Sequence, residues 1–244
     1  RSPRAWTAFF WMGLLNNIIP FLLIVWGQKE IESGLAAILT AAAPIFSVIV
    51  AGIWLKDEPL TRSKLLGTAL GLIGVVVLIG PSALAGLSAN LLAQLAVLGA
   101  ALSYAFAGVY ARRFTRMNVD PIVAASGQLL MSSLIMVALV LTFESPTQLI
   151  ESSARVWVVV GLMAVFSTAL AYILYFRLLA SAGATNAILV TLLIPVTAIL
   201  LGALFLDERL QWLHFLGMVV IGLGLSVIDG RLWQRMVRPR RAPR

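Results

Sequence analysis

Two adjacent amides inside a strongly apolar run are the first residues of this sequence that could do chemistry. Asn16 and Asn17 precede Pro20 in a stretch long and apolar enough to cross a bilayer. An unsatisfied amide is costly in hydrocarbon, so both side chains must face protein or water. They could hydrogen-bond a substrate beside a backbone that Pro20 loosens, or they could hold two helices together. Both interpretations stay open.

Two prolines interrupt later apolar runs at matching places. Pro44 and Pro195 each remove a helix hydrogen bond and free a carbonyl at mid-membrane depth. Broken helices in corresponding positions of two halves are typical of a transporter site, and a packing kink is the alternative. Hydroxyl side chains near both prolines favour the site: Thr40, Ser47, Thr191 and Thr197.

Four polar-tipped side chains complete the candidate substrate-binding set. They lie within or at the ends of apolar runs: Trp26, Tyr104, Gln128 and Tyr172. Aromatic residues at the ends of membrane spans usually form an interfacial belt, which is the alternative interpretation for Trp26. Tyr104, Gln128 and Tyr172 lie deeper in their runs. The set therefore predicts amide, hydroxyl and aromatic groups around a cavity.

Two acidic pairs and several glycines have structural interpretations. Asp57-Glu58 and Asp207-Glu208 precede apolar runs, where they are expected to complement the positive amino-terminal ends of helices. The glycines Gly67, Gly71, Gly74, Gly217, Gly222 and Gly224 are expected to allow close helix packing.

Several chemistries lack the residues that they need. The chain has no cysteine and one histidine, His214, which excludes disulfides, thiol chemistry, a histidine-built metal site and the usual serine triad. No Asp, Glu or Lys lies deep within an apolar run. We therefore expect no enzyme, no catalytic residue, no metal and no cofactor.

The composition indicates a membrane protein. Hydrophobic residues make up 61% of the chain and charged residues 11%, and the mean hydropathy is +0.99. The net charge of +8 comes from residues at the ends of runs and in the tail, so we expect no nucleic-acid partner. The continuous apolar runs favour helices over a β-barrel. Eight runs qualify as transmembrane helices: 5–26, 34–55, 63–80, 91–111, 121–142, 156–176, 184–206 and 211–228.

Part of the sequence is written twice. A shift of 150 positions places Ala37 on Ala187, Asp57-Glu58 on Asp207-Glu208, and Gly67 on Gly217. Such self-similarity predicts a duplicated unit. The first unit is expected over 1–80 with three helices and the second over 91–230 with five, followed by a basic tail at 231–244. By this arithmetic two amino-terminal helices are expected to be absent from the first unit.

Lysine and arginine accumulate on the cytoplasmic side of membrane proteins. An orientation with both ends of the chain inside places 15 of the 18 basic residues in the cytoplasm. Equivalent helices are then separated by an odd number of crossings, so the two copies are inverted. The predicted fold is an all-α polytopic membrane protein, built as an inverted-repeat helical bundle. Inverted repeats are common in secondary transporters, whose sites lie between the halves.

These residues resemble the drug/metabolite transporter superfamily, and within it the ten-helix proteins of EamA type. The resemblance is carried by Leu14 to Phe21, Trp26-Gly27-Gln28, Ser33 to Pro44, and the Asp57-Glu58 and Asp207-Glu208 corners ahead of glycine-spaced helices. It implies a secondary transporter, as an exporter, of small metabolites, amino acids or drugs across the bacterial inner membrane by alternating access. A non-transporting remnant or assembly protein is the alternative.

The expected partners follow from the same interpretation. They are a small-molecule substrate and the lipid bilayer, and a homodimer is a candidate assembly.

Overall fold

The computed structural model describes residues 3–80, 84, 90–143, 153–205 and 211–229. Nearly all of these residues are helical and no strand occurs among them, as the predicted all-α class requires. The helices are α1 (Pro3–Gly13), α2 (Ile19–Gly27), α3 (Ser33–Thr40), α4 (Ala43–Trp54), α5 (Arg62–Ile79), α6 (Leu91–Arg116), α7 (Pro121–Phe143), α9 (Ala154–Leu162), α10 (Ala171–Leu189), α11 (Ile194–Phe205) and α12 (Trp212–Asp229). Two π-helical segments, Leu14–Ile18 and Met163–Leu170, and a 3₁₀ turn, Val190–Leu193, join neighbouring helices.

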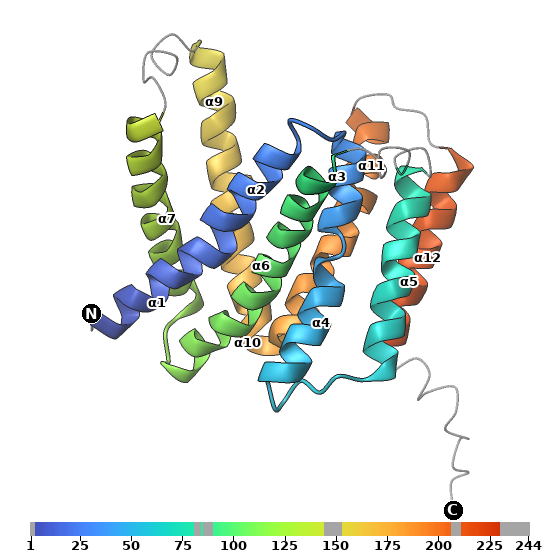
Figure 1. Cartoon of the computed structure of the whole chain (residues 1–244), viewed down its shortest axis with the longest axis horizontal. Helices are drawn as coiled ribbons and strands as arrows, with labels where there is room; N and C mark the ends of the chain where they lie inside the picture. Colours follow the sequence, from blue (N-terminus) through green and yellow to red (C-terminus); the bar gives the residue numbers. More distant parts are fainter. Residues whose placement is uncertain (1–2, 81–83, 85–89, 144–152, 206–210, 230–244) are drawn as a thin grey trace, which may run out of the picture.

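Six of the described stretches are long and apolar enough to cross a membrane. They are Pro3–Gly27, Gly34–Trp54, Arg62–Ile79, Leu91–Arg116, Pro121–Phe143 and Ala154–Phe205. The last holds 52 residues, but Gly183 interrupts it with a φ of 85°, so that it crosses the bundle twice (Figure 1). With the shorter apolar helix α12, a helix accounts for each of the eight predicted runs.

The helix ends gather at two opposite edges of the bundle, which Figure 1 shows as lower and upper. The corner between α4 and α5 lies at the lower edge, beside the end of α6, and its Asp57 pairs with Arg112 of α6. The end of α11 and the start of α12 lie at the upper edge. Asp207-Glu208 itself lies outside the described residues. The flanking helices agree with the predicted inversion, and the basic residues mark the lower edge as the expected cytoplasmic one.

Glycines let α5 and α12 pack with their backbones close together. A Cβ added to Gly224 would lie 2.6 Å from the carbonyl oxygen of Gly67, and one added to Gly74 would lie 2.7 Å from the backbone nitrogen of Ile221. These positions agree with the predicted packing role. Gly222 differs, since a Cβ there would meet nothing within 4 Å.

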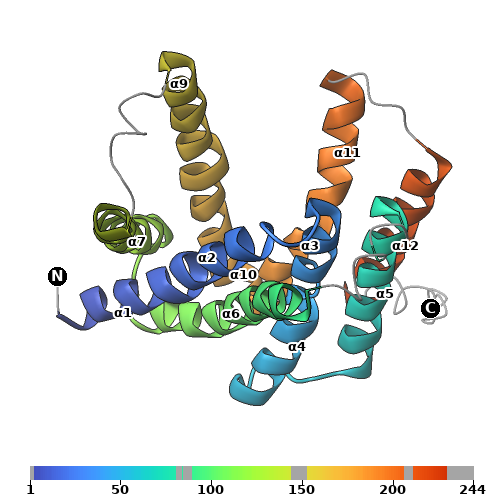
Figure 2. The same cartoon turned by 45° about the horizontal axis from the view of Figure 1, so that its top comes forward.

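Helix α6 lies at the centre of the molecule, against α2, α3, α4 and α10. Its buried face is rich in alanine, which allows these helices to approach closely. At the periphery, α9 has no buried residue (Figure 2). The central helices are therefore the ones that position a site.

Candidate functional site

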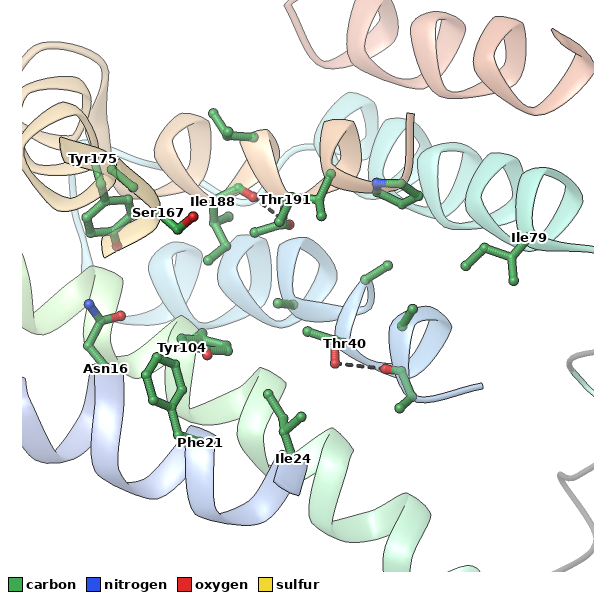
Figure 3. Close-up of a pocket in the computed structure, with 18 of the residues that line it drawn as sticks. Asn16, Phe21, Ile24, Thr40, Ile79, Tyr104, Ser167, Tyr175, Ile188 and Thr191 are labelled. Carbon is green, nitrogen blue, oxygen red and sulfur yellow. Dashed lines mark hydrogen bonds between the residues drawn. The ribbon is translucent and has the colours of Figure 1, made fainter. Parts of the chain in front are cut away.

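A cavity of about 950 Å³ lies between the central helices. Its walls come from α2, α3, α4, α5, α6, the α10–α11 region and the start of α12, so both predicted units contribute (Figure 3). The volume lies within the range of small-molecule sites. The cavity is therefore large enough for a metabolite-sized ligand.

One end of the cavity lies deep in the bundle and is lined by polar and aromatic groups. Figure 3 shows Asn16, Tyr104, Ser167 and Tyr175 gathered there from different helices. The ring of Tyr172, which also lines the cavity, stands edge-on to Tyr175, with 6.5 Å between the ring centroids. This end offers hydroxyl and amide groups beside aromatic faces.

The other end of the cavity reaches the upper edge. Its lining includes Gln28 just after α2, Gly34 in the first turn of α3, Ile79 at the end of α5 and His214 in the first turn of α12. No lining residue belongs to the α4–α5 corner at the lower edge. The cavity is therefore directed toward the edge that the charge pattern predicts to be external.

The two amides of the first span have separate roles. Asn17 is buried away from the cavity, where its Nδ2 donates to Ser132 Oγ at 2.7 Å and its Oδ1 accepts from the Tyr172 hydroxyl. Asn16 lines the cavity, and its Nδ2 donates to Gln128 Oε1 at 3.3 Å. Asn17 thus holds three helices together, whereas Asn16 connects the cavity to a buried amide. The substrate-binding interpretation that the sequence left open therefore fits Asn16, and the interhelical interpretation fits Asn17.

The backbone beside these amides is irregular because Pro20 lacks an N–H group. The π-helical segment Leu14–Ile18 ends just before it. Ser103 Oγ donates to the Leu15 carbonyl at 2.7 Å, and the Tyr172 hydroxyl lies 3.4 Å from the Asn16 carbonyl oxygen. Side chains of neighbouring helices thereby satisfy carbonyl groups at a π-bulge, a feature frequent at functional sites.

The two predicted helix breaks both lie beside the cavity. Pro44 and Pro195 each follow a threonine by four residues, so neither can bond to the carbonyl of Thr40 or Thr191. Both threonines line the cavity, and their hydroxyls donate to the backbone, to Ala36 and Ile188 respectively, at 2.8 Å. The two breaks are one residue out of step in the 150-position repeat, and they place one threonine of each predicted unit at the same cavity.

The structure separates the predicted site residues into two groups. Asn16, Tyr104, Tyr172 and Pro195 line the cavity. Asn17 and Gln128 lie outside the lining in the buried polar network, and Pro44 is buried next to the lining residue Ala43. Trp26 is also outside the lining, on an exposed outer face at the end of α2. Its exposure fits the interfacial belt.

Several polar lining residues were not among the predicted ones: Gln28, Ser167, Thr168, Tyr175 and His214. The backbone relates two of them to the first span. Ser167 and Thr168 lie 150 positions after Asn17 and Ile18, and both stretches are π-helical. The duplication thus extends to the bulge itself.

The expected helix-start role of Asp57 and Glu58 is wrong. Helix α5 is capped by Thr61, whose hydroxyl accepts from the Lys64 backbone nitrogen at 3.2 Å. Asp57 pairs instead with Arg112 of α6, and the Glu58 carboxylate accepts from two backbone N–H groups of α10. The corner lies too far before α5 to cap it, and a neighbouring helix offers unpaired donors.

The described lining of the cavity carries no permanently charged side chain. Among the described residues that line it, none is Asp, Glu, Lys or Arg, and His214 is the one titratable side chain other than tyrosine. The backbone nitrogen of Gln211 donates to His214 Nδ1 at 3.2 Å. Such walls suit polar groups that carry no net charge.

Comparisons with known proteins agree with this architecture. The model of the EamA-like transporter family matches residues 1–80 and 91–228. A probable amino-acid metabolite efflux pump of Escherichia coli (strain K12) is 30% identical over 215 residues, which cover 84% of this chain and 71% of the relative. The uncharacterized transporter YoaV of Bacillus subtilis (strain 168) is 26% identical over 216 residues, with 88% and 72% covered.

Two further likenesses concern location and fold. The uncharacterized inner membrane transporter YedA of Escherichia coli (strain K12) is 27% identical over 202 residues, covering 82% of this chain and 63% of the relative. One crystal structure superposes with a TM-score of 0.75 at 18% identity and covers 98% of this chain and 79% of its own. That likeness shows a shared fold.

Proposed function

Since this chain belongs to the EamA-like transporter family, we propose that it exports a small, polar molecule of no net charge across the bacterial inner membrane by alternating access. Its membership makes it a membrane transporter, and its multiple apolar helices make it a multi-pass protein. The cargo class, direction and mechanism are the proposed part.

The observation that carries the proposal is the cavity between the two proline-broken spans. Thr40 and Thr191 reach it from the two predicted units, each four residues before its proline, as expected when a site lies between inverted repeats. Rocking one unit against the other would then expose the same groups to each side of the membrane in turn.

The walls support the proposed cargo class. Amide and hydroxyl groups can hydrogen-bond a polar head, and Tyr104, Tyr172 and Tyr175 offer aromatic faces to an apolar body. The absence of Asp, Glu, Lys and Arg from the described lining disfavours ions of net charge. Free neutral amino acids and their metabolites fit this description, and the Escherichia coli relative is named as a probable efflux pump for such compounds.

The described conformation suits an outward-facing state of the exporter. The positive-inside rule assigns the lower edge to the cytoplasm. The cavity lining extends to the upper edge and stops short of the lower one. Cargo in this state would exchange with the outside.

A cavity-filling substitution tests the proposal. Ala37 lines the cavity, so we expect Ala37→Trp to abolish the resistance that the expressed chain gives to toxic amino-acid analogues. Leu162→Trp is the matched control, because Leu162 is 54% exposed on α9 and lies outside the lining. Full resistance with Ala37→Trp at normal protein level would contradict transport through this cavity.

A non-transporting role in membrane assembly is the second candidate. The observation in its favour is that α9, at the periphery, buries none of its residues. Liposomes that contain only this chain distinguish the two roles: uptake of the analogue supports the transporter, and its absence at normal protein level supports the assembly role. Association with a second copy of the chain stays a prediction.

A further inference from the structure

Glu58 of the first unit binds the second unit at the lower edge of the bundle. Its Oε1 accepts from the backbone N–H of Ala184 at 2.7 Å, and its Oε2 accepts from that of Thr185 at 2.9 Å. The carboxyl side chain is buried, with 9% of the residue exposed. These two hydrogen bonds therefore join residues that lie 126 and 127 positions apart in the sequence.

The two N–H groups need this partner because the helix is interrupted just before them. Gly183 has a φ of 85°, so the helix restarts at Ala184 and its first N–H groups have no carbonyl one turn earlier. A carboxylate is the strongest acceptor for such groups and also complements the helix dipole. Glycine is required at the break, since a Cβ on Gly183 would lie 2.5 Å from Glu58 Oε1.

The restarted helix is also a wall of the cavity. Ala187 and Ile188 line the cavity within one turn of Thr185. Between the cavity and the lower edge, the buried residues Ala51, Leu55 and Ala184 belong to one packed core. A path from the cavity to the lower edge therefore requires the α4–α5 corner to separate from α10, and that movement breaks both bonds of Glu58.

The half-helix that corresponds to it in the first unit is α3, which begins at the upper edge (Figure 1). The shift of 150 positions places Ala184 and Thr185 on Gly34 and Leu35, in the first turn of α3. The side chain of Glu32, the amino-terminal capping residue of α3, makes no capping hydrogen bond, and Gly34 lines the cavity there. The half-helix at the closed edge is thus capped by a carboxylate of the other unit, whereas at the edge that the cavity reaches the capping residue of α3 makes no such bond.

We propose that Glu58 is the latch that holds the cavity closed at the cytoplasmic edge and that must release α10 in each transport cycle. This inference rests on the proposed function. Its chemistry is specific to Glu58, because the neighbouring Asp57 pairs with Arg112 at the surface, where ion pairs contribute little.

Thiol accessibility tests the latch in the full chain, which has no native cysteine. Ser167→Cys places a nearly isosteric thiol at the deep end of the cavity. A membrane-impermeant maleimide is added to intact cells, where it reaches the outer side, or to inverted membrane vesicles, where it reaches the cytoplasmic side. We expect this reporter to react in cells and to be protected in inverted vesicles.

Adding Glu58→Ala should raise the rate of labelling in inverted vesicles by about tenfold or more. A tenfold rise corresponds to about 1.4 kcal/mol. Glu58→Gln keeps one acceptor oxygen and should give a smaller rise in the labelling rate. If the alanine variant does not fold, the glutamine variant tests the latch in its place. Asp57→Asn is the matched control and should leave the rate unchanged.

Two results would overturn the latch. Labelling of both Glu58 variants at the parental rate in inverted vesicles, with the parent still reactive in cells, would refute the latch and leave the proposed function standing. A parent that reacts from neither side would contradict the cavity and the latch together.

Discussion

At the scale of single residues, the adjacent amides show how neighbours in one helix serve different purposes. Asn16 and Asn17 have the same chemistry, but successive residues of a helix point in different directions. Asn16 lines the cavity, whereas Asn17 bonds to Ser132 and Tyr172. One side chain is therefore available to a ligand and the other to the fold.

Alanine substitutions should separate these roles. Asn17→Ala removes the hydrogen bonds to Ser132 and Tyr172 and is expected to lower the free energy of unfolding by about 1–3 kcal/mol. Asn16→Ala is expected to weaken the apparent affinity for the transported analogue by roughly tenfold, the effect of one lost hydrogen bond of about 1.4 kcal/mol. Detergent-solubilised thermal unfolding and liposome uptake measure the two effects. Equal effects of both variants on stability, with uptake unaltered by Asn16→Ala, would contradict the division.

The residue types of the site could be predicted from sequence, but their directions could not. An amide pair in hydrocarbon requires partners wherever it points, so composition alone selects Asn16 and Asn17 equally. The role of Glu58 was missed for a related reason. Its partners are N–H groups that become available only through the break at Gly183, and backbone donors leave no mark in the sequence.

At the scale of helices, the bundle uses two kinds of glycine. Gly67 and Gly224 face each other across the contact of α5 and α12, where a Cβ has no room. Gly222 lies on the same helix as Gly224 but meets open space. From the sequence, all of these glycines are predicted to allow close helix packing. Their spacing shows which face of the helix they share, but it does not show whether a neighbouring helix covers that face.

Two alanine substitutions on α12 test this distinction. Gly224→Ala would place its Cβ 2.6 Å from the Gly67 carbonyl oxygen and 2.7 Å from the Gly71 backbone nitrogen. Backbone atoms cannot move aside easily, so we expect destabilisation by about 1–3 kcal/mol. Gly222→Ala is the control and should be neutral or stabilising by up to about 1 kcal/mol. Similar unfolding temperatures for both variants would show that α5 and α12 do not pack this closely.

The helices themselves could be predicted because each crossing needs an apolar run of nearly fixed length. The breaks were partly predictable, since proline marks two of them. The π-helical segments Leu14–Ile18 and Met163–Leu170 were not predicted, although they lie in equivalent positions of the repeat. Their sequences resemble each other little, so only the shared backbone shape shows the relation.

At the scale of the molecule, both predicted units contribute to one cavity, and we propose that they meet there in opposite orientations. The lower edge is closed by the α4–α5 corner on α10, and the cavity is directed to the upper edge. Similar movements of a unit and of its inverted copy can open the cavity at the lower edge and close it at the upper edge, which is the basis of alternating access. Transport by this mechanism therefore depends on the inversion more than on any side chain.

Single-cysteine labelling tests that inversion directly. Lys56→Cys marks the exposed corner before α5, and Gln211→Cys marks the exposed start of α12, in a chain without native cysteine. A membrane-impermeant maleimide should label Gln211→Cys in intact cells and should label Lys56→Cys only after the membrane is permeabilised. Labelling of both positions from the same side of the membrane would contradict the account.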